Sequence, residues 1–220
     1  MKISVVIPAF NHWHLTHQLL WNIYKTCGKL HEVIVIDDAS TEGEMHSGLQ
    51  WWMNANLHTV KHIRNPENLG FLRTANRGLK EATGDAVILI STDVKVHKNI
   101  AIMIGDALLE NPKTLISGKV YRESTGWNKF GDKIFPYAEG FLLATTKASW
   151  EELGYLDERY ARNDFEDVDL STTALSMGYD LLELPPESVH HMSAQTIAYG
   201  AEREELTKIN QKKFEAKWIK

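Results

Sequence analysis

Short apolar runs alternate with helical segments through the first hundred residues, and this alternation limits the possible folds more than any other feature. Three of the runs, ISVVIP at 3–8, EVIVID at 32–37 and AVILIS at 86–91, are almost purely apolar, whereas HTVKHI at 58–63 is more polar. Strands as apolar as the first three are buried on both faces, as in a parallel sheet covered by helices.

Segments with helical periodicity separate these runs. The predicted helices cover 11–27, with Asn11 as the N-cap, 43–56 and 72–83. Strands that are joined through helices form right-handed crossovers. The order therefore predicts an α/β fold with a doubly wound, mainly parallel sheet flanked by helices.

The second half of the chain is less regular. The predicted elements there are a helix at 99–112, a strand at 115–124, a loop at 125–137, a strand at 139–146, helices at 147–154 and 166–178, a strand at 179–186 and a helix from about 201 onward. No repeat or linker divides the sequence, so we expect a single domain over 1–220.

Composition limits the class of protein. The 220 residues suffice for one core, and the formal net charge of -5 argues against a nucleic-acid partner, because phosphate backbones attract basic surfaces. Cys27 is the single cysteine, so no intrachain disulfide is expected. The sequence shows neither an apolar run long enough to cross a bilayer nor a signal-peptide pattern. We therefore expect a soluble, cytoplasmic protein with no transmembrane segment.

Polar residues follow the predicted strands. They are 8–11 after the first strand, Asp37 and Asp38 at the end of the second, and 91–93 after AVILIS. The carboxyl ends of parallel strands meet at one edge of the sheet, and ligands bind there. The topology therefore predicts a binding site built from these residues.

Asp37 and Asp38 repel each other, so a metal ion, a hydrogen-bond donor or water must offset their charge. The stretch DDAST is equally good turn chemistry. A carboxylate at this edge also suits hydrogen bonds from a nucleoside. No GxGxxG follows the first strand, so a dinucleotide cofactor is not supported.

Groups suited to a phosphate or a metal ion lie near the same edge. Arg64, Arg73 and Arg77 offer positive charge, and the helix after Gly70 offers its N-terminal amides. Asp93 is a hard oxygen ligand, although a carboxylate there also suits a turn cap. One carboxylate is enough for a divalent ion that also takes diphosphate oxygens and water.

Acidic residues and a histidine pair stand out in the second half. The stretch NDFEDVDL places Asp164, Glu166, Asp167 and Asp169 where a helix begins. The helix dipole favours acids there, but one of them also suits a general base that takes a proton from a hydroxyl group. The histidines of HHM, at 190 and 191, follow two prolines and return to the edge that carries Asp93, so one of them is a candidate ligand of the same ion.

Seven stretches follow one another in a distinctive order: SVVIPAFN, VIVIDDAST, NPENLGF, AVILISTDVKV, EGFLLATTKASWEELGYLDERY, FEDVDLSTTALSMGY and LPPESVHHM. This ordered set, over about residues 2–195, resembles the motifs of family-2 glycosyltransferases. The resemblance implies the GT-A fold, a Rossmann-like, mixed and mainly parallel sheet. It also implies a nucleotide-binding half at about 1–98, an acceptor and catalytic half at 99–200, and a C-terminal helix at 201–220.

The resemblance also implies roles for single residues. Asp167 matches the catalytic base, with Glu166 beside it. Asp93 and His191, with His190 as the alternative, match the ligands of a divalent cation, Mn²⁺ or Mg²⁺. The residues that match the nucleotide and donor-sugar site are Pro8, Phe10, Asn11, Asp38, Asn68, Gly70, Arg73, Asn76, Thr92, Asp93 and Gly140, with Glu139 beside Gly140.

The implied reaction is inverting transfer of one sugar from a nucleoside-diphosphate sugar, a UDP-sugar by default, to an acceptor hydroxyl of a saccharide or glycoconjugate. Ser91 stands where the DxD-type motif of the family has its first Asp. We therefore expect the ion to bind weakly without nucleotide. The chain lacks the extra segments and membrane helices of processive synthases, so transfer of single sugars is expected.

Two other functions compete with this interpretation. A sugar-nucleotide nucleotidyltransferase needs a Gly-rich, basic loop after the first strand, and PAFNHWH has no Gly, Lys or Arg. A non-catalytic nucleotide-binding or carbohydrate-binding module has no need of a base such as the FEDVDL cluster supplies.

Overall fold

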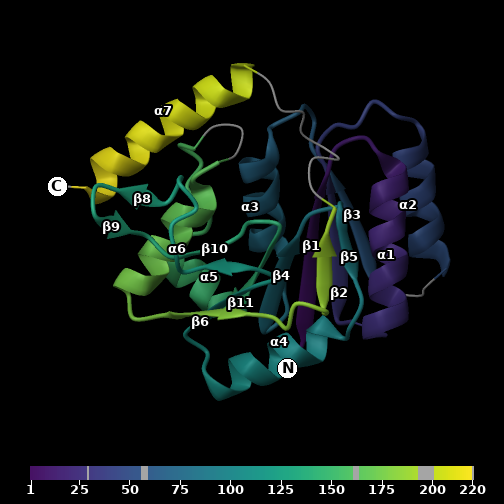
Figure 1. Cartoon of the computed structure of the whole chain (residues 1–220). Coiled ribbons are helices and arrows are strands. Elements are labelled where there is room, and N and C mark those ends of the chain that lie inside the picture. The colour runs from purple at the N-terminus through teal and green to yellow at the C-terminus, as the bar shows by residue number, and fades with distance from the viewer. Residues whose placement is uncertain (29, 56–58, 161–163, 193–200, 220) are drawn as a thin grey trace.

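A seven-stranded sheet forms the centre of the computed structural model (Figure 1). The structure describes residues 1–28, 30–55, 59–160, 164–192 and 201–219. The strands of this sheet, in spatial order, are β12 (Asp180–Glu183), β6 (Thr114–Ser117), β11 (Leu142–Thr146), β4 (Ala86–Ile90), β1 (Ile3–Ala9), β2 (Glu32–Asp37) and β3 (Val60–Arg64). β11 runs antiparallel to β4 and β6, and the remaining described pairs are parallel. The predicted mixed, mainly parallel sheet is confirmed.

The apolar runs of the sequence occupy the middle of this sheet. Every residue of β1, β2 and β4 is buried, and β1 lies between the other two. The more polar β3 lies at the edge and leaves part of its surface exposed. Burial on both faces therefore explains why the central strands carry so few polar side chains.

Helices cover both faces of the sheet. One face packs against α1 (Trp13–Cys27), α2 (Glu44–Ala55) and α4 (Ile100–Glu110), and the other against α3 (Phe71–Glu81), α5 (Lys147–Leu153) and α6 (Glu166–Ser176). Phe214 of α7 (Ala201–Trp218) joins the second apolar cluster through Phe130, Phe135 and Phe165. The two apolar clusters share the sheet, so Val5 belongs to one and Val6 to the other. No helix in the described ranges combines the length and the apolar character that crossing a membrane requires.

Three pairs of short strands among the described residues lie outside the central sheet, and the sequence did not predict these pairings. β5 (Val94–Val96) pairs with β13 (Val189–His191), β7 (Val120–Tyr121) with β10 (Tyr137–Ala138), and β8 (Lys129–Phe130) with β9 (Lys133–Ile134). The single strand predicted at 115–124 is wrong, since β6 and β7 are separate at Gly118. A Cβ on Gly118 would lie 2.6 Å from the Phe141 ring, so the packing of Phe141 requires a glycine at this break.

The predicted N-cap of α1 is also wrong. The helix begins at Trp13, and Asn11 and His12 precede it in the left-handed region, each with φ of 51°. The Asn11 Oδ1 atom instead accepts a hydrogen bond from the Thr41 amide at 2.8 Å. Asn11 therefore joins two loops rather than capping a helix. Asn56, the last residue of the helix predicted at 43–56, and His58, the first residue of the strand predicted at 58–63, lie outside the described residues.

Gly78 lets α3 lie directly on the sheet. A Cβ there would lie 2.4 Å from Val6 Cγ1 and 2.9 Å from Ile36 Cγ1. We expect Gly78→Ala to lower the free energy of unfolding by ~1–3 kcal/mol, because overpacking forces the backbone or side chains to move. Gly105→Ala on α4 is the control, since its Cβ would meet only Ile3 at 3.7 Å. Urea denaturation measures both, and equal effects would contradict the close packing of α3.

Candidate active site

Three loops meet at the carboxyl edge of the sheet, as the topology predicts. Ala9 at the end of β1 is paired with Asp37 at the end of β2, and the Asp38 amide donates to the Ala9 carbonyl at 2.8 Å. The Asn11 amide donates to Ser40 Oγ at 2.8 Å. Pro8 is buried within β1, whereas Phe10 is 44% exposed at this edge.

Asp37 is compensated by donors and a cation within the chain. Its carboxylate accepts a hydrogen bond from the Ser40 amide at 2.8 Å and forms an ion pair with Arg64. Burial by itself raises the pKa of Asp37. The His62 ring, whose Nε2 atom lies 3.6 Å away, and the hydrogen bonds from Ser40 and Arg64 outweigh this effect and hold the pKa well below its usual range.

The positive charges predicted for a phosphate are only partly available. Arg64 is held by Asp37 and by the Ser40 carbonyl, and Arg77 by Asn65 and the Arg64 carbonyl. Both arginines therefore stabilise the loop, and a role for either at a phosphate stays a prediction. Arg73 is exposed, with its Nε atom 3.7 Å from a Glu158 carboxylate oxygen.

Asp38 organises the loop that leads into α3. Its buried carboxylate accepts hydrogen bonds from Asn65 Nδ2 at 2.7 Å and from the Leu69 and Gly70 amides, each at 2.9 Å. The exposed Asn68 also accepts from the Gly70 amide, at 3.1 Å. These contacts place Asn68 and Gly70 at the start of α3, beside the nucleotide-site candidate Asp38.

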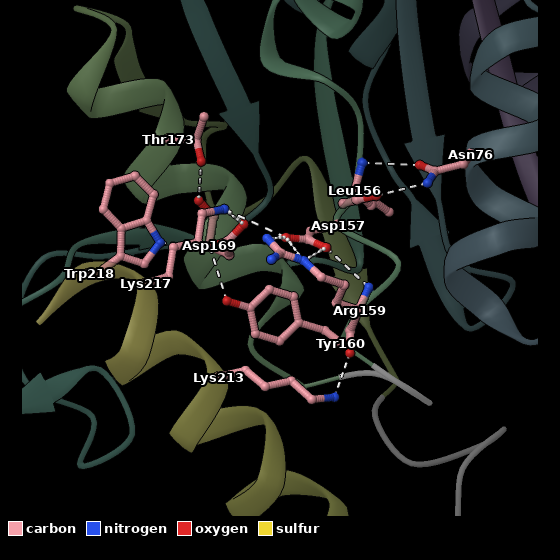
Figure 2. A network of polar contacts seen from close by, with 10 residues as sticks. All are labelled: Asn76, Leu156, Asp157, Arg159, Tyr160, Asp169, Thr173, Lys213, Lys217 and Trp218. Atoms are coloured by element: carbon pink, nitrogen blue, oxygen red, sulfur yellow. Dashed lines mark hydrogen bonds and ion pairs between the residues drawn. The ribbon is translucent and has the colours of Figure 1, made fainter.

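Asn76 does not join this group. Its Nδ2 atom donates to the Leu156 carbonyl at 2.8 Å, and its Oδ1 atom accepts from the Leu156 amide at 3.0 Å (Figure 2). The Nδ2 atom also donates to Glu158 at 3.0 Å. It lines a cavity of about 340 Å³ together with Asp169 and Lys217. Its polar atoms hold the loop after α5, and its role near the sugar-diphosphate stays a prediction.

Asp93 and His191 face each other. Asp93 is buried, and its Oδ1 atom lies 3.4 Å from His191 Nε2. The antiparallel pairing of β5 with β13 sets His191 opposite Val94, and the Met192 amide donates to the Asp93 carbonyl at 2.9 Å. Thr92, which precedes Asp93, is buried as well.

The two histidines of HHM point in opposite directions. Adjacent residues of a strand project from opposite faces, so His190 turns away from Asp93 when His191 faces it. His190 is exposed and lies opposite Lys95, whereas the His191 ring stacks on Phe141 with centroids 4.5 Å apart. The geometry thus favours His191 over His190 as a ligand.

The pair suits a divalent cation as a partial site. Cis ligand atoms of an octahedral ion with ~2.1 Å bonds lie ~3 Å apart, close to the observed 3.4 Å. No cluster of three or more His, Cys, Asp or Glu side chains suited to a metal occurs among the described residues. Two protein ligands leave positions for diphosphate oxygens and water, as Mg²⁺ sites usually do. The residues therefore fit an ion that binds together with a diphosphate.

Asp167 is oriented by the backbone. Its Oδ2 atom accepts a hydrogen bond from the Gly140 amide at 3.1 Å, and its Oδ1 atom one from the Val168 amide at 2.8 Å. Burial raises the pKa of Asp167 to about 6, and the Glu139 carboxylate adds to the effect. A carboxylate with a pKa this close to neutral is a stronger base than an ordinary Asp.

Two further carboxyls surround Asp167. Burial, followed by the charge of Asp167, raises the pKa of Glu166 well above its usual value. The buried Glu166 Oε2 atom has no hydrogen-bond partner within the described residues. Burial also raises the pKa of Glu139, which accepts a hydrogen bond from the Tyr121 hydroxyl at 3.3 Å.

Sequence reasoning missed two aromatic residues at this site. Phe141 stacks on His191, and its carbonyl accepts from the Ser91 amide at 2.9 Å, so it links the Asp93 loop to β11. Tyr121 contacts Glu139 and stacks on Tyr137 with centroids 5.0 Å apart. The position of Phe141 directly after Gly140 was an available signal, whereas nothing in the sequence marks Tyr121.

The raised pKa of Asp167 makes a prediction about stability. The folded protein holds this proton more tightly than the unfolded chain, whose Asp pKa is ~3.9. Asp167 therefore contributes stability at low pH that is lost as the pH rises through about 6. We expect the melting temperature of Asp167→Asn to exceed that of the unaltered protein, by a difference that grows as the pH rises from ~3.9 to about 6. Scanning calorimetry measures the difference, and a difference independent of pH would contradict the shift.

The sequence and the fold match known proteins. The profile of "Glycosyl transferase family 2" matches residues 4–177. Polypeptide N-acetylgalactosaminyltransferase 11 of Xenopus tropicalis is 25% identical over 206 residues, which cover 78% of this chain and 34% of that protein. The chain thus spans about a third of the length of this relative.

Two solved structures share the fold. A mannosyltransferase from Pyrobaculum calidifontis, in complex with GDP-Man and Mn²⁺, superposes with a TM-score of 0.69 at 20% identity, over 89% of this chain and 58% of that one. GalNAc-T7 with UDP, GalNAc and Mn²⁺ gives a TM-score of 0.71 at 17% identity, over 90% of this chain and 45% of that one. At these identities the likeness shows the fold, which is the GT-A fold that the motifs imply.

Proposed function

The chain belongs to glycosyltransferase family 2, and from that premise we propose that it transfers one sugar from a nucleoside-diphosphate sugar to an acceptor hydroxyl group. The observation that carries the proposal is the juxtaposition of two groups at the carboxyl edge of the sheet. One is the Asp93–His191 pair, and the other is Asp167, which the Gly140 amide orients. Phe141, next to Gly140 and stacked on His191, connects them.

Asp167 acts as the general base. It takes the proton of the acceptor hydroxyl while that oxygen attacks the anomeric carbon of the donor, and the bond from this carbon to the diphosphate oxygen breaks. The electron pair leaves with the nucleoside diphosphate, so direct displacement inverts the anomeric configuration. A product of retained configuration in proton NMR spectra would exclude this step.

Asp93 and His191 hold the divalent cation. An ion bound there supplies positive charge to the departing diphosphate. Both solved structures contain Mn²⁺ and a nucleotide or nucleotide sugar, which supports a Mn²⁺ or Mg²⁺ site in this chain. Ser91 adds no carboxylate, so the protein contributes one carboxylate and one imidazole.

The donor lies along the edge formed by the first hundred residues. Phe10, Asn11 and Asp38 serve the nucleoside, with Pro8 shaping the strand end. Asn68, Gly70 and Arg73 at the start of α3 serve the diphosphate, where helix amides favour an anion. Thr92, Glu139 and Gly140 lie toward the donor sugar. UDP is the default nucleotide, and GalNAc-T7 was crystallised with UDP.

The acceptor is a saccharide or a glycoconjugate. It approaches from the half of the domain at 99–200, where Asp167 lies, and the donor occupies the half at about 1–98. Membership of this family disfavours the two alternatives, a nucleotidyltransferase and a non-catalytic binding module.

Loss of the base tests the reaction. We expect Asp167→Asn to fold, to bind nucleotide and to lose ~10²–10⁴-fold in turnover, the usual contribution of general-base catalysis. The assay is release of nucleoside diphosphate from a panel of sugar nucleotides with Mn²⁺ and a mixture of acceptors. Asp106→Asn, an exposed position on α4, is the matched control and keeps full turnover. Full turnover by Asp167→Asn would exclude its role as base.

The opposite orientation of the two histidines provides a matched test of the ion site. We expect Asp93→Ala and His191→Ala to abolish the gain in UDP affinity that Mn²⁺ brings, measured by isothermal titration calorimetry. His190→Ala is the control and should retain that gain, because its side chain faces away. Equal behaviour of the two histidine variants would contradict the assignment of His191.

A further inference from the structure

Helix α7 packs along the segment that carries Asp167. It follows residues 4–177, which the family profile matches, so it lies outside the matched region. Figure 1 shows it as the yellow helix crossing the end of the molecule beside α6. Its sequence is largely charged and polar, and its described contacts to this segment are mostly hydrogen bonds and ion pairs.

The first contact is with Asp164, three residues before the base. Its carboxylate accepts hydrogen bonds from Arg203 Nη2 at 2.8 Å and Arg203 Nε at 3.3 Å. The Thr207 hydroxyl donates to the same carboxylate at 2.6 Å, and Asn210 Nδ2 donates to the Asp164 carbonyl at 3.1 Å. Three successive turns of α7 thus bind one residue.

The second contact is apolar. Phe165 lies directly before α6, and its ring centroid is 5.7 Å from that of Phe214 of α7. Phe214 is fully buried and stacks on Phe130 of β8 at 5.3 Å. Phe165, the residue that precedes α6, is therefore packed between the β8–β9 hairpin and α7.

The third contact is with Asp169, two residues after the base. Figure 2 shows its buried carboxylate between two elements: the Tyr160 hydroxyl donates from one side, and α7 donates from the other. The distances to its oxygens are 3.1 Å from Tyr160, 2.8 Å from Lys217 Nζ and 2.7 Å from Trp218 Nε1. Lys213 of α7 also donates to the Arg159 carbonyl.

These residues form one stripe of α7. Positions 203, 207, 210, 214 and 217 are spaced by three or four residues, so they lie on one face of the helix. The stripe binds the chain before, at and after the start of α6, and Asp167 lies between its anchor points Asp164 and Asp169.

The start of α6 needs such support. Asp164 and Phe165 are both in the left-handed region, with φ of 71° and 77°, and this backbone conformation is unfavourable for side chains other than glycine. Phe165, the residue before α6, offers no capping side chain, and the described side-chain acceptor for an amide of the first turn is Asp167 itself, which accepts from Val168. Contacts from outside the segment must therefore hold this geometry, and the described contacts of α7 supply them.

We propose that the stripe of α7 formed by Arg203, Thr207, Asn210, Phe214, Lys217 and Trp218 is a clamp that positions the base by fixing Asp164 and Asp169. The proposal rests on the proposed function, in which Asp167 takes the acceptor proton. The clamp residues are positioning residues, since they act on Asp167 through the backbone of 164–169. Displacement of a catalytic group by about 1 Å costs up to ~10²-fold in rate.

Two single variants test the clamp. Arg203→Gln removes the paired hydrogen bonds to Asp164, and Thr207→Val removes one hydroxyl donor at nearly constant size. Lys208→Gln removes the same charge as Arg203→Gln from an exposed position of the same helix, so it is the matched control. Arg203→Lys keeps the charge and should restore part of the lost rate.

We expect Arg203→Gln and Thr207→Val to lower kcat by roughly 10-fold or more while the KM for the donor stays within error. Lys208→Gln should leave both constants unchanged. In the Asp167→Asn background the same two variants should cause no further loss, because the base they position is gone. A packing role alone predicts equal losses in both backgrounds. Unchanged kcat in both variants, or equal losses, would overturn the proposal.

Hydrogen–deuterium exchange separates the clamp from the proposed function. The amides of 164–168 should exchange faster in Arg203→Gln than in Lys208→Gln, with melting temperatures that agree between the two. If the unaltered protein turned over no sugar nucleotide, the proposed function and with it the positioning of a base would be overturned. Unchanged exchange at 164–168 would overturn the clamp even in a fully active protein.

Discussion

The parallel pairing of β1 with both β2 and β4 is the interaction on which the rest of the structure depends. Six register pairs join β1 to β2 and four join it to β4, and all three strands are buried. Because the strands run in the same direction, their carboxyl ends meet at one edge. The loops that carry Asn11, Asp38 and Asp93 must therefore lie together, and the antiparallel β11 brings Gly140 to the same edge.

The carboxylates at this edge differ in how the chain compensates them. Asp37 forms an ion pair with an arginine, and Asp38 accepts hydrogen bonds from two backbone amides and an asparagine, so both stabilise loops. Asp167 accepts hydrogen bonds from two amides, and burial, together with the neighbouring Glu139 carboxylate, raises its pKa to about 6. A carboxylate that lacks a cation partner retains basicity, so the Arg64 counter-charge separates Asp37 from the proposed base Asp167.

Helix α7 adds a second level of organisation. The family profile ends at residue 177, yet the geometry of 164–169 depends on side chains from 203–218. The contacts are mainly polar and involve Asp164 and Asp169, acids that the helix dipole alone would also favour. A helix without a marked apolar stripe therefore docks through hydrogen bonds to one short segment, next to the residue that is proposed to take the acceptor proton.

The sequence by itself predicted the central strands, the fold and the family of this protein. The apolar runs predicted β1, β2 and β4, because strands that are buried on both faces consist almost wholly of apolar residues. The ordered motifs predicted the fold and the family. The resemblance favoured His191 with His190 as the alternative, whereas the opposite orientation of the two side chains follows from the pairing of β5 with β13. The sequence did not predict that Arg64 and Asn76 hold loops, or that α7 contacts the start of α6, because the partners of these residues lie far away in the sequence. Such contacts depend on how distant segments pack together, and local periodicity carries no information about them.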